Sequence, residues 1–188
     1  MTAICVLLGL IAWTLIEYLM HRFVFHQRLL GAGGARDNLR HHARVDWFAP
    51  AVYRVALALA LTGVLMLAGL AFREVRPFGA ITLGLIAGWL FYEGLHRRIH
   101  VAAPIGGYGR WARRHHLSHH FADAQRNHGV TSPLWDFVFG TYLPAPVVRV
   151  PGMHAGKFPW LIEAGPGRSQ GVRAGWAREY VIGGSANG

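Results

Sequence analysis

The sequence is poor in charged residues and in cysteine, and each shortage excludes a class of protein. Only 15% of the 188 residues are charged, whereas a water-soluble domain carries about 25%, so an ordinary soluble globule is not expected. The single cysteine, Cys5, cannot form an intramolecular disulfide or a zinc site built from cysteines. Aromatic residues reach 12% and apolar runs are long, which excludes a chain that is disordered throughout.

Acidic residues are also scarce, because nine Asp and Glu stand against 19 Arg and Lys. A basic surface of this kind is the electrostatic footprint of nucleic-acid binding. Here, however, the arginines lie beside apolar runs and not along a polar helix face, and no zinc-finger, basic-zipper or aromatic-rich RNA-binding motif is present. The distribution favours arginines that flank a membrane on its cytoplasmic side, and no nucleic-acid partner is predicted.

Three long apolar segments, residues 1–20, 55–72 and 77–95, contain only two charged side chains, Glu17 and Glu93. A helix needs about 20 mostly apolar residues to cross the hydrocarbon core of a bilayer. The first segment has no Lys or Arg before its apolar part, so it is interpreted as a retained anchor and not as a cleaved signal peptide. The sequence therefore predicts an all-α integral membrane bundle with about three transmembrane helices.

The arginines also predict the orientation of the bundle. Six lie in residues 21–54 and six in residues 96–126, against two in the turn 73–77. Because cytoplasmic loops carry an excess of basic residues, the N-terminus is expected outside and the chain after residue 95 inside. Residues 1–143 are predicted to form a membrane domain with a cytosolic helical cap. Residues 144–188, rich in Pro and Gly, are predicted to form a tail that is surface-associated or partly disordered.

Histidine is the abundant polar residue, with 12 copies, and most of these lie in four clusters on the predicted cytoplasmic side. Within a cluster the spacing is three or four residues, which places the side chains on one face of a helix. The pair His21 and His26 is the exception, because five positions rotate by about 140° on an α-helix. These two rings can meet one centre only if the helix bends or ends between them, or they serve different sides of a metal pair.

Clustered neutral imidazoles are typical of a metal site. One tetrahedral zinc ion uses four ligands, so the number of clustered rings predicts two ions with four or five ligands each. A haem held by two histidines would leave most of the rings unexplained. The predicted metal ligands are His21, His26, His41, His42, His96, His100, His116, His119 and His120.

Four other residues are candidates for supporting this centre. Asn38 precedes His41 and His42 at helical spacing, and Asn38 or His128 could complete the ligand set. Glu17 and Glu93 lie near the inner ends of membrane helices, where an acidic residue is a candidate for function. Each is expected to accept the spare ring N–H of a metal-bound histidine; the alternative is an ion pair with a nearby arginine, such as Arg97 for Glu93.

Basic residues near the membrane have two interpretations as well. Arg110, Arg113 and Arg114 could hold an anionic headgroup or carboxylate at the interface. The alternative, which the composition favours, is the ordinary excess of arginine on the cytoplasmic side. His154, in the Pro- and Gly-rich tail, is interpreted as an ordinary surface histidine.

Four motifs in order, WTLIEYLMHRFVFH, HRRIH, HHLSHHFAD and NHGVTSPLWDFVFGTY, together resemble the fatty acid hydroxylase superfamily, which includes sterol desaturases. The similarity covers about residues 10–143 and is greatest to the membrane part of the fatty acid 2-hydroxylases. It implies a membrane-bound di-iron oxygenase that uses O2 to hydroxylate a C–H bond of a lipid. By motif, His21 and His26 match the first histidine box, His41 and His42 the end of the second, His96 and His100 the third, and His116, His119 and His120 the fourth.

The chain departs from this family in ways that leave alternatives open. Asn38 stands where the second box normally begins with histidine, three membrane segments are found where four are usual, and no cytochrome b5-like haem motif is present. Electrons are therefore expected from a separate donor, such as a cytochrome b5-like protein, a ferredoxin or a reductase. Two irons are expected, with zinc possible in preparations. The rival functions are a sterol or carotenoid ring hydroxylase or desaturase, and a non-catalytic membrane protein that binds metal or haem.

Overall fold

The structure, a computed structural model, describes residues 1–163 and 171–183. Three helices in the described residues are long and apolar enough to cross a membrane. They are α1 (Thr2–Leu19), which continues directly into the π-helical segment η1 (Met20–His26), α3 (Ala51–Ala71) and α4 (Val75–Val101). The predicted all-α membrane bundle with three spanning helices is confirmed.

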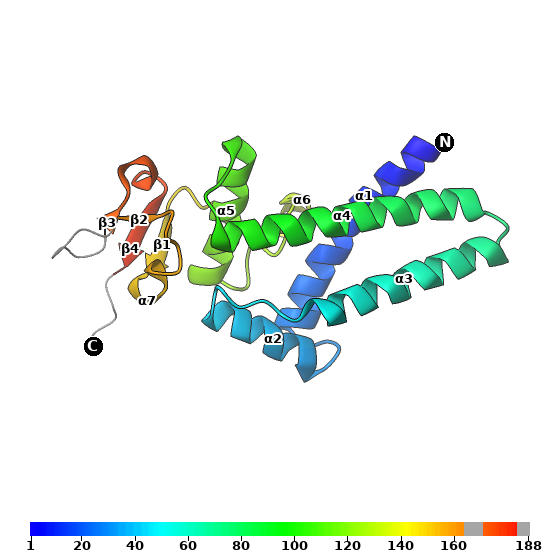
Figure 1. Cartoon of the computed structure of the whole chain (residues 1–188), viewed down its shortest axis with the longest axis horizontal. Helices are drawn as coiled ribbons and strands as arrows, with labels where there is room; N and C mark the ends of the chain where they lie inside the picture. Colours follow the sequence, from blue (N-terminus) through cyan, green and yellow to red (C-terminus); the bar gives the residue numbers. More distant parts are fainter. Residues whose placement is uncertain (164–170, 184–188) are drawn as a thin grey trace.

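The free turn of the α3–α4 hairpin lies at one end of the molecule, and the shorter helices and the strands lie towards the other end (Figure 1). Helices α3 and α4 form an antiparallel hairpin, and α1 crosses α4 with its N-terminus towards the hairpin turn. The shorter helices α2 (Ala32–Ala43), α5 (Gly106–Phe121) and α6 (Leu134–Val138) lie towards the other end of the hairpin. The N-terminus and the histidine-bearing helix ends therefore lie at opposite ends of the bundle.

Glycine allows α1 and α4 to pack closely. A Cβ atom on Gly84 would collide with the backbone oxygen of Val6 and would lie 3.0 Å from the Cα of Gly9, and one on Gly88 would lie 2.8 Å from the Cβ of Trp13. Small residues at a crossing let two membrane helices approach until their backbones touch. Helix α3 approaches α4 closely at Gly69, near the hairpin turn, where a Cβ atom would lie 2.9 Å from the Cβ of Phe78. Elsewhere it exposes apolar side chains such as Leu59 and Leu67, as expected for a helix surrounded by lipid.

The described part of the tail, which was predicted to be surface-associated or partly disordered, forms short strands and helices that pack on α5, and the predicted character of the tail as a whole stays a prediction. Its strands and short helices are β1 (Val148–Pro151) parallel to β4 (Tyr180–Gly183), β2 (Ile162–Glu163) antiparallel to β3 (Gly171–Val172), α7 (Gly152–Ala155) and η2 (Ala174–Trp176). Phe158, Leu161 and Tyr180 are fully buried in one core with Ala112 and Leu117 of α5. Residues 164–170 and 184–188 of the predicted tail lie outside the described residues.

The close crossing of α1 and α4 predicts that Gly84→Ala destabilises the protein. The added methyl group has no space beside the Val6 carbonyl, and overpacking of this kind costs about 1–3 kcal/mol. We expect the thermal melting temperature of the detergent-solubilised protein to fall by about 3–8 °C. The control is Gly63→Ala on α3, where a Cβ atom meets nothing within 4 Å. An unchanged melting temperature for Gly84→Ala would show that the crossing is looser than described.

Candidate metal centre

Nine histidine rings from four distant segments converge into two groups. The segments are η1, α2, α4 and α5, and in each group one ring nitrogen per residue lies within 4.8 Å of all the others. One group comprises His41, His96, His100, His116 and His120, and the other His21, His26, His42 and His119. These are the nine predicted ligands, brought together at the end of the bundle away from the N-terminus.

The π-helical segment η1 explains how His21 and His26 reach the same group. A π-helix hydrogen-bonds from residue i to i+5 and is wider than an α-helix, so residues five apart return to nearly the same face. Their ring centroids lie 5.1 Å apart. The helix therefore neither bends sharply nor ends between them; it widens. This geometry is rare, is found mostly at functional sites, and is not encoded in any spacing rule for α-helices.

Consecutive histidines place the two groups side by side. His41 belongs to the first group and its neighbour His42 to the second, and His120 and His119 are divided in the same way. Adjacent residues on an α-helix point about 100° apart, so each of these helices contributes to both groups. The rings of His42 and His120, from different groups, stack with centroids 4.1 Å apart.

The spacing of the ring nitrogens suits metal binding better than hydrogen bonding. The Nε2 atom of His116 lies 3.0 Å from the Nε2 atoms of both His100 and His120. A ring nitrogen offers one N–H or one lone pair, so it cannot satisfy two such neighbours. Ligands of one ion with bonds of about 2.0–2.1 Å lie about 3 Å apart. The same spacing joins His41 to His96 and His26 to His119.

Backbone carbonyls orient three of the rings. The Nδ1–H of His21 donates to the oxygen of His128 at 2.7 Å, that of His41 to the oxygen of Trp47 at 2.7 Å, and that of His119 to the oxygen of Arg126 at 2.6 Å. Since a carbonyl only accepts, the proton is on Nδ1 and the Nε2 lone pair is free. Fixing the tautomer in this way is the usual task of groups behind metal-bound histidines.

The structure corrects the expected role of Glu17. Its buried carboxylate accepts no ring N–H and instead accepts the backbone N–H of Val130, the backbone N–H of Thr131 at 2.8 Å, and the Thr131 hydroxyl at 2.7 Å. These bonds hold the loop whose His128 carbonyl orients His21. Glu17 therefore supports the histidine groups indirectly, by holding the loop that lies between its carboxylate and the rings.

A second carboxylate, Asp136 of α6, fixes the same loop and was not identified from the sequence. It is fully buried and accepts the backbone N–H groups of His128 and Gly129 at 2.8 and 2.9 Å and the Thr141 hydroxyl at 2.7 Å. It also faces the Nε2 of His115 at 3.3 Å. Burial raises the pKa of Asp136, but the hydrogen bonds from His115, Thr141 and the backbone of Gly129, with the charge interaction with His115, together outweigh burial and lower the pKa. His115 is thus part of the loop anchor and belongs to neither group.

The expected bond from Glu93 to a histidine is not found either. Glu93 forms an ion pair with Arg54 of α3 at 2.9 Å and accepts the indole N–H of Trp89 at 3.3 Å. The alternative, an ion pair between Glu93 and a nearby arginine, is what the structure shows, but the arginine is Arg54 and not Arg97. The pair links α3 to α4, a contact between separate helices that helical spacing alone does not predict.

Both candidates for completing the ligand set lie beside the four-histidine group. The amide Nδ2 of Asn38 is 3.1 Å from the Nε2 of His26, and a half-turn of the amide would present its oxygen there. The ring of His128 is 5.4–5.6 Å from the rings of His21, His26 and His119. Its Nε2–H donates to the Gln125 oxygen at 3.1 Å, whereas its buried Nδ1 has no partner among the described residues.

The rings outside the membrane helices are held neutral. Burial, together with the neighbouring His26 and His41, lowers the pKa of His42 to about 3, and burial lowers the pKa of His128 to about 4. Burial and the surrounding rings also hold the pKa of His119 and His120 well below the usual value of histidine. Neutral imidazole is the form that binds a metal ion, so the centre has its ligands in the required state at neutral pH.

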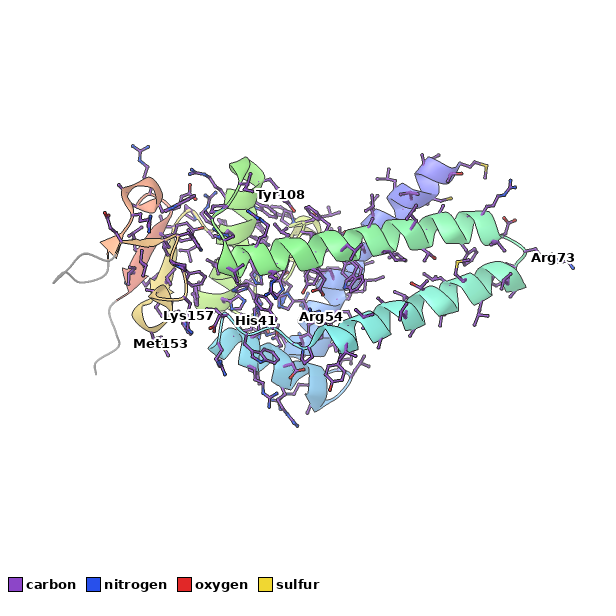
Figure 2. All side chains as sticks on the ribbon, viewed as in Figure 1. His41, Arg54, Arg73, Tyr108, Met153 and Lys157 are labelled. Atoms are coloured by element: carbon purple, nitrogen blue, oxygen red, sulfur yellow. The ribbon has the colours of Figure 1, made fainter. Side chains whose placement is uncertain are left out.

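A cavity of about 650 Å³ opens onto both groups. Its wall includes His21 of the four-histidine group and His41 and His96 of the five-histidine group. Figure 2 places His41 and Arg54 between α2, α4 and the start of α3, where the cavity lies. The other lining residues include apolar side chains and the Arg54–Glu93 ion pair.

The fold and the centre together define an integral membrane protein with a histidine-rich site that can hold two metal ions. The family model described as fatty acid hydroxylase matches residues 6–141. The chain therefore belongs to the fatty acid hydroxylase family.

Individual relatives agree with this membership. The chain is 33% identical over 141 residues to the dihydroceramide fatty acyl 2-hydroxylase FAH2 of Arabidopsis thaliana, covering 71% of this chain and 58% of the relative. It is 30% identical over 146 residues to the fatty acid 2-hydroxylase of Homo sapiens, covering 73% of this chain and 39% of the relative. The chain thus spans well under two thirds of these relatives.

A solved structure also matches. The structure described as full-length scs7p, with only the hydroxylase domain visible, is 27% identical with a TM-score of 0.61, covering 76% of this chain and 56% of that chain. The fold of about three quarters of this chain is therefore similar to that of the hydroxylase domain in that structure.

The position of Glu17 behind the loop predicts that Glu17→Ala weakens metal binding. Loss of three hydrogen bonds frees the loop that orients His21, and such changes lower metal affinity about 10–100-fold. Affinity is measured by competition with a chelator. Glu17→Gln, which keeps an acceptor oxygen, should lose less, and Glu74→Ala, an exposed residue at the hairpin turn, should lose nothing. Equal affinities for wild type and Glu17→Ala would show that the loop holds its position without the carboxylate.

The lowered pKa values predict acid sensitivity of the metal-free protein. His42 and His128 bind protons in the folded state only near pH 3–4, whereas in the unfolded chain they do so near pH 6.5. Between these values the unfolded state holds more protons, so stability falls as the pH decreases from 7 to 5. Melting of chelator-treated protein should shift downward by at least about 3 °C over this interval, and less in His42→Gln. A melting temperature independent of pH would contradict this.

Proposed function

We propose that the protein is a membrane-bound di-iron oxygenase that hydroxylates a fatty-acyl C–H bond of a lipid with O2 and external electrons. The observation that carries the proposal is the opening of both histidine groups onto one large, partly apolar cavity. Membership of the fatty acid hydroxylase family supports the reaction class.

The nine histidines would hold the two ions, five around one and four around the other. Imidazole suits iron and zinc alike, so the choice of iron rests on the family. Bound iron would supply the activation of O2 that hydroxylation of an unactivated C–H bond requires. The four-histidine group has room for Asn38 or His128, and we propose that one of them completes it.

The protein's own contribution is to bind and orient the substrate. Phe25, Leu57 and Tyr92 give the cavity apolar walls suited to a hydrocarbon chain. The Arg54–Glu93 ion pair makes one part of the same wall polar. Glu93 lies three residues before His96 on α4. A lipid with its polar group at this pair would present nearby chain carbons to the histidines, and a filled cavity would exclude water from them.

The relatives favour an acyl chain over a ring substrate. The relatives found carry names of fatty acid, fatty acyl or ceramide hydroxylases. These names describe those proteins, and on this basis we propose a fatty-acyl lipid in preference to a sterol or carotenoid.

Electron supply and orientation are also proposed. The arginine distribution supports a cytoplasmic position for the histidine end of the bundle. A soluble or membrane-bound donor, such as a cytochrome b5-like protein, a ferredoxin or a reductase, would reach the centre from that side.

The proposal is tested by lipid analysis of cells that express the wild type, His119→Ala or His154→Ala. His119 belongs to the four-histidine group, whereas His154 lies outside both. We expect a one-oxygen mass gain in fatty-acyl lipids with the wild type and His154→Ala, and its loss to background with His119→Ala. The same gain in the His119→Ala cells would refute the proposed centre.

Metal analysis distinguishes the proposed enzyme from the alternative of a non-catalytic protein that binds metal or haem. Purified protein should contain about two metal ions per chain, with iron supporting turnover. About one ion per chain without oxidised lipid would instead favour a binding protein whose second position is altered by Asn38. A sharp haem absorption band would contradict the di-iron proposal altogether.

A further inference from the structure

A second hollow lies on the face of α4 opposite the histidine cavity. It measures about 390 Å³ and lies between α4, the connection after it and the start of α5, a size within the range of about 300–1,000 Å³ typical of ligand pockets. At about 100° per residue, the α4 residues of this groove and those of the cavity point to opposite sides of the helix. Figure 2 shows Tyr108, a groove residue, across α4 from His41.

One end of the groove is apolar and the other basic. The apolar part is lined by Leu90, Phe91, Leu95, Ile99 and Ile105, of which Leu90 and Phe91 are exposed on α4, a helix long and apolar enough to cross a membrane. Arg98 and Arg113 line the basic part, close to the C-terminal end of α4. The Tyr108 hydroxyl is already engaged, because it donates to the Thr131 oxygen at 2.8 Å.

Arg113 is buried, and no acidic side chain in residues 1–163 or 171–183 forms an ion pair with it. It is 1% exposed, and its guanidinium stacks on Trp160 with Cζ 4.0 Å from the ring centroid. Its Nη2 caps α4 by donating to the oxygens of Arg98, at 2.7 Å, and Ala102, whereas Nε and Nη1 make no hydrogen bond to the described residues. Burial, helped by Arg98, lowers the pKa of Arg113 to about 10.

The neighbouring arginines differ from Arg113 because each is either paired with an acid or exposed. Arg110 and Arg114 both form ion pairs with Glu179, at 2.7 Å each, so two of the three arginines considered for an anionic group are already paired. Arg98 is exposed and forms no ion pair with the described residues. A buried charge that is left unpaired is costly, and an anion in the groove would offset the charge of Arg113 while contacting Arg98.

We propose that this groove binds an anionic membrane phospholipid, with an acyl chain along the apolar face of α4 and the phosphate at Arg98, beside the charge of Arg113. A membrane lipid is the occupant favoured by the groove's position, because its apolar part belongs to a spanning helix and its basic part to the end of that helix. A phosphate is the group that these two cations complement. The site is separate from the histidine cavity, and its test requires no turnover.

Two glycines of α4 provide a matched pair of variants. Gly94 lines the groove, and a Cβ atom there would meet nothing within 4 Å. Leucine at this position would fill the groove without a backbone clash. Gly79 is equally open but lies outside the groove, nearer the hairpin turn, so Gly79→Leu adds the same side chain to the same helix elsewhere.

The experiment measures binding of phosphatidylglycerol and phosphatidylcholine to the full chain in detergent by native mass spectrometry. The wild type and Gly79→Leu should bind phosphatidylglycerol about tenfold more tightly than phosphatidylcholine, as expected for a charge-assisted contact. Gly94→Leu should bind both lipids more weakly by about tenfold, and Arg98→Gln should lose the preference between them. Melting temperatures check that each variant is folded.

Three outcomes would overturn the proposal. One is equal binding of the two lipids by the wild type, which requires no variant. The second is unchanged binding in both Gly94→Leu and Arg98→Gln. The third is competition by a free fatty acid that displaces phosphatidylglycerol completely, which would identify a carboxylate lipid as the occupant.

Discussion

The structure depends on the convergence of nine imidazole lone pairs into a small buried volume. Nitrogen atoms 3.0 Å apart cannot all be protonated, since like charges at that distance repel strongly in a buried site. They cannot all be satisfied by one another either, because each offers a single donor or acceptor. Shared cations would resolve both problems, and the predicted metal centre would then account for the meeting of four segments far apart in the sequence at one end of the bundle.

Two successive sets of hydrogen bonds position the histidine rings. Backbone carbonyls fix the tautomers of His21, His41 and His119. Two of these carbonyls belong to the loop after α5, which is held in place by Glu17 from α1 and Asp136 from α6. Because the carboxylates contact the loop and not the two histidine groups, the nine predicted ligands are all neutral rings, unlike a centre built on carboxylate ligands.

The length of the apolar runs predicted the spanning helices. The spacing of the histidines within each helix, together with the position of all four clusters on one side of the membrane, predicted the convergence of the nine rings. Metal binding at those rings stays a prediction. The roles of Glu17 and Glu93 could not be obtained in this way, since both contact residues distant in the chain. In the sequence, the π-helical widening at His21–His26 appears only as an unusual spacing of five residues between the two histidines. The strands of the tail could not be predicted from the sequence, because each has only two to four residues, too few to show a repeating pattern.

Helix α4 is the common wall of the two hollows, and this arrangement constrains what either can do. One face carries Glu93 and His96 towards the cavity, while the opposite face carries Leu95 and Arg98 towards the groove. Its C-terminal turn is fixed by Arg113 through the oxygens of Arg98 and Ala102, and His100 lies within that turn. A lipid phosphate that stabilises the arginines would therefore also stabilise the turn that positions a proposed ligand, so the lipid surroundings and the centre share one structural element.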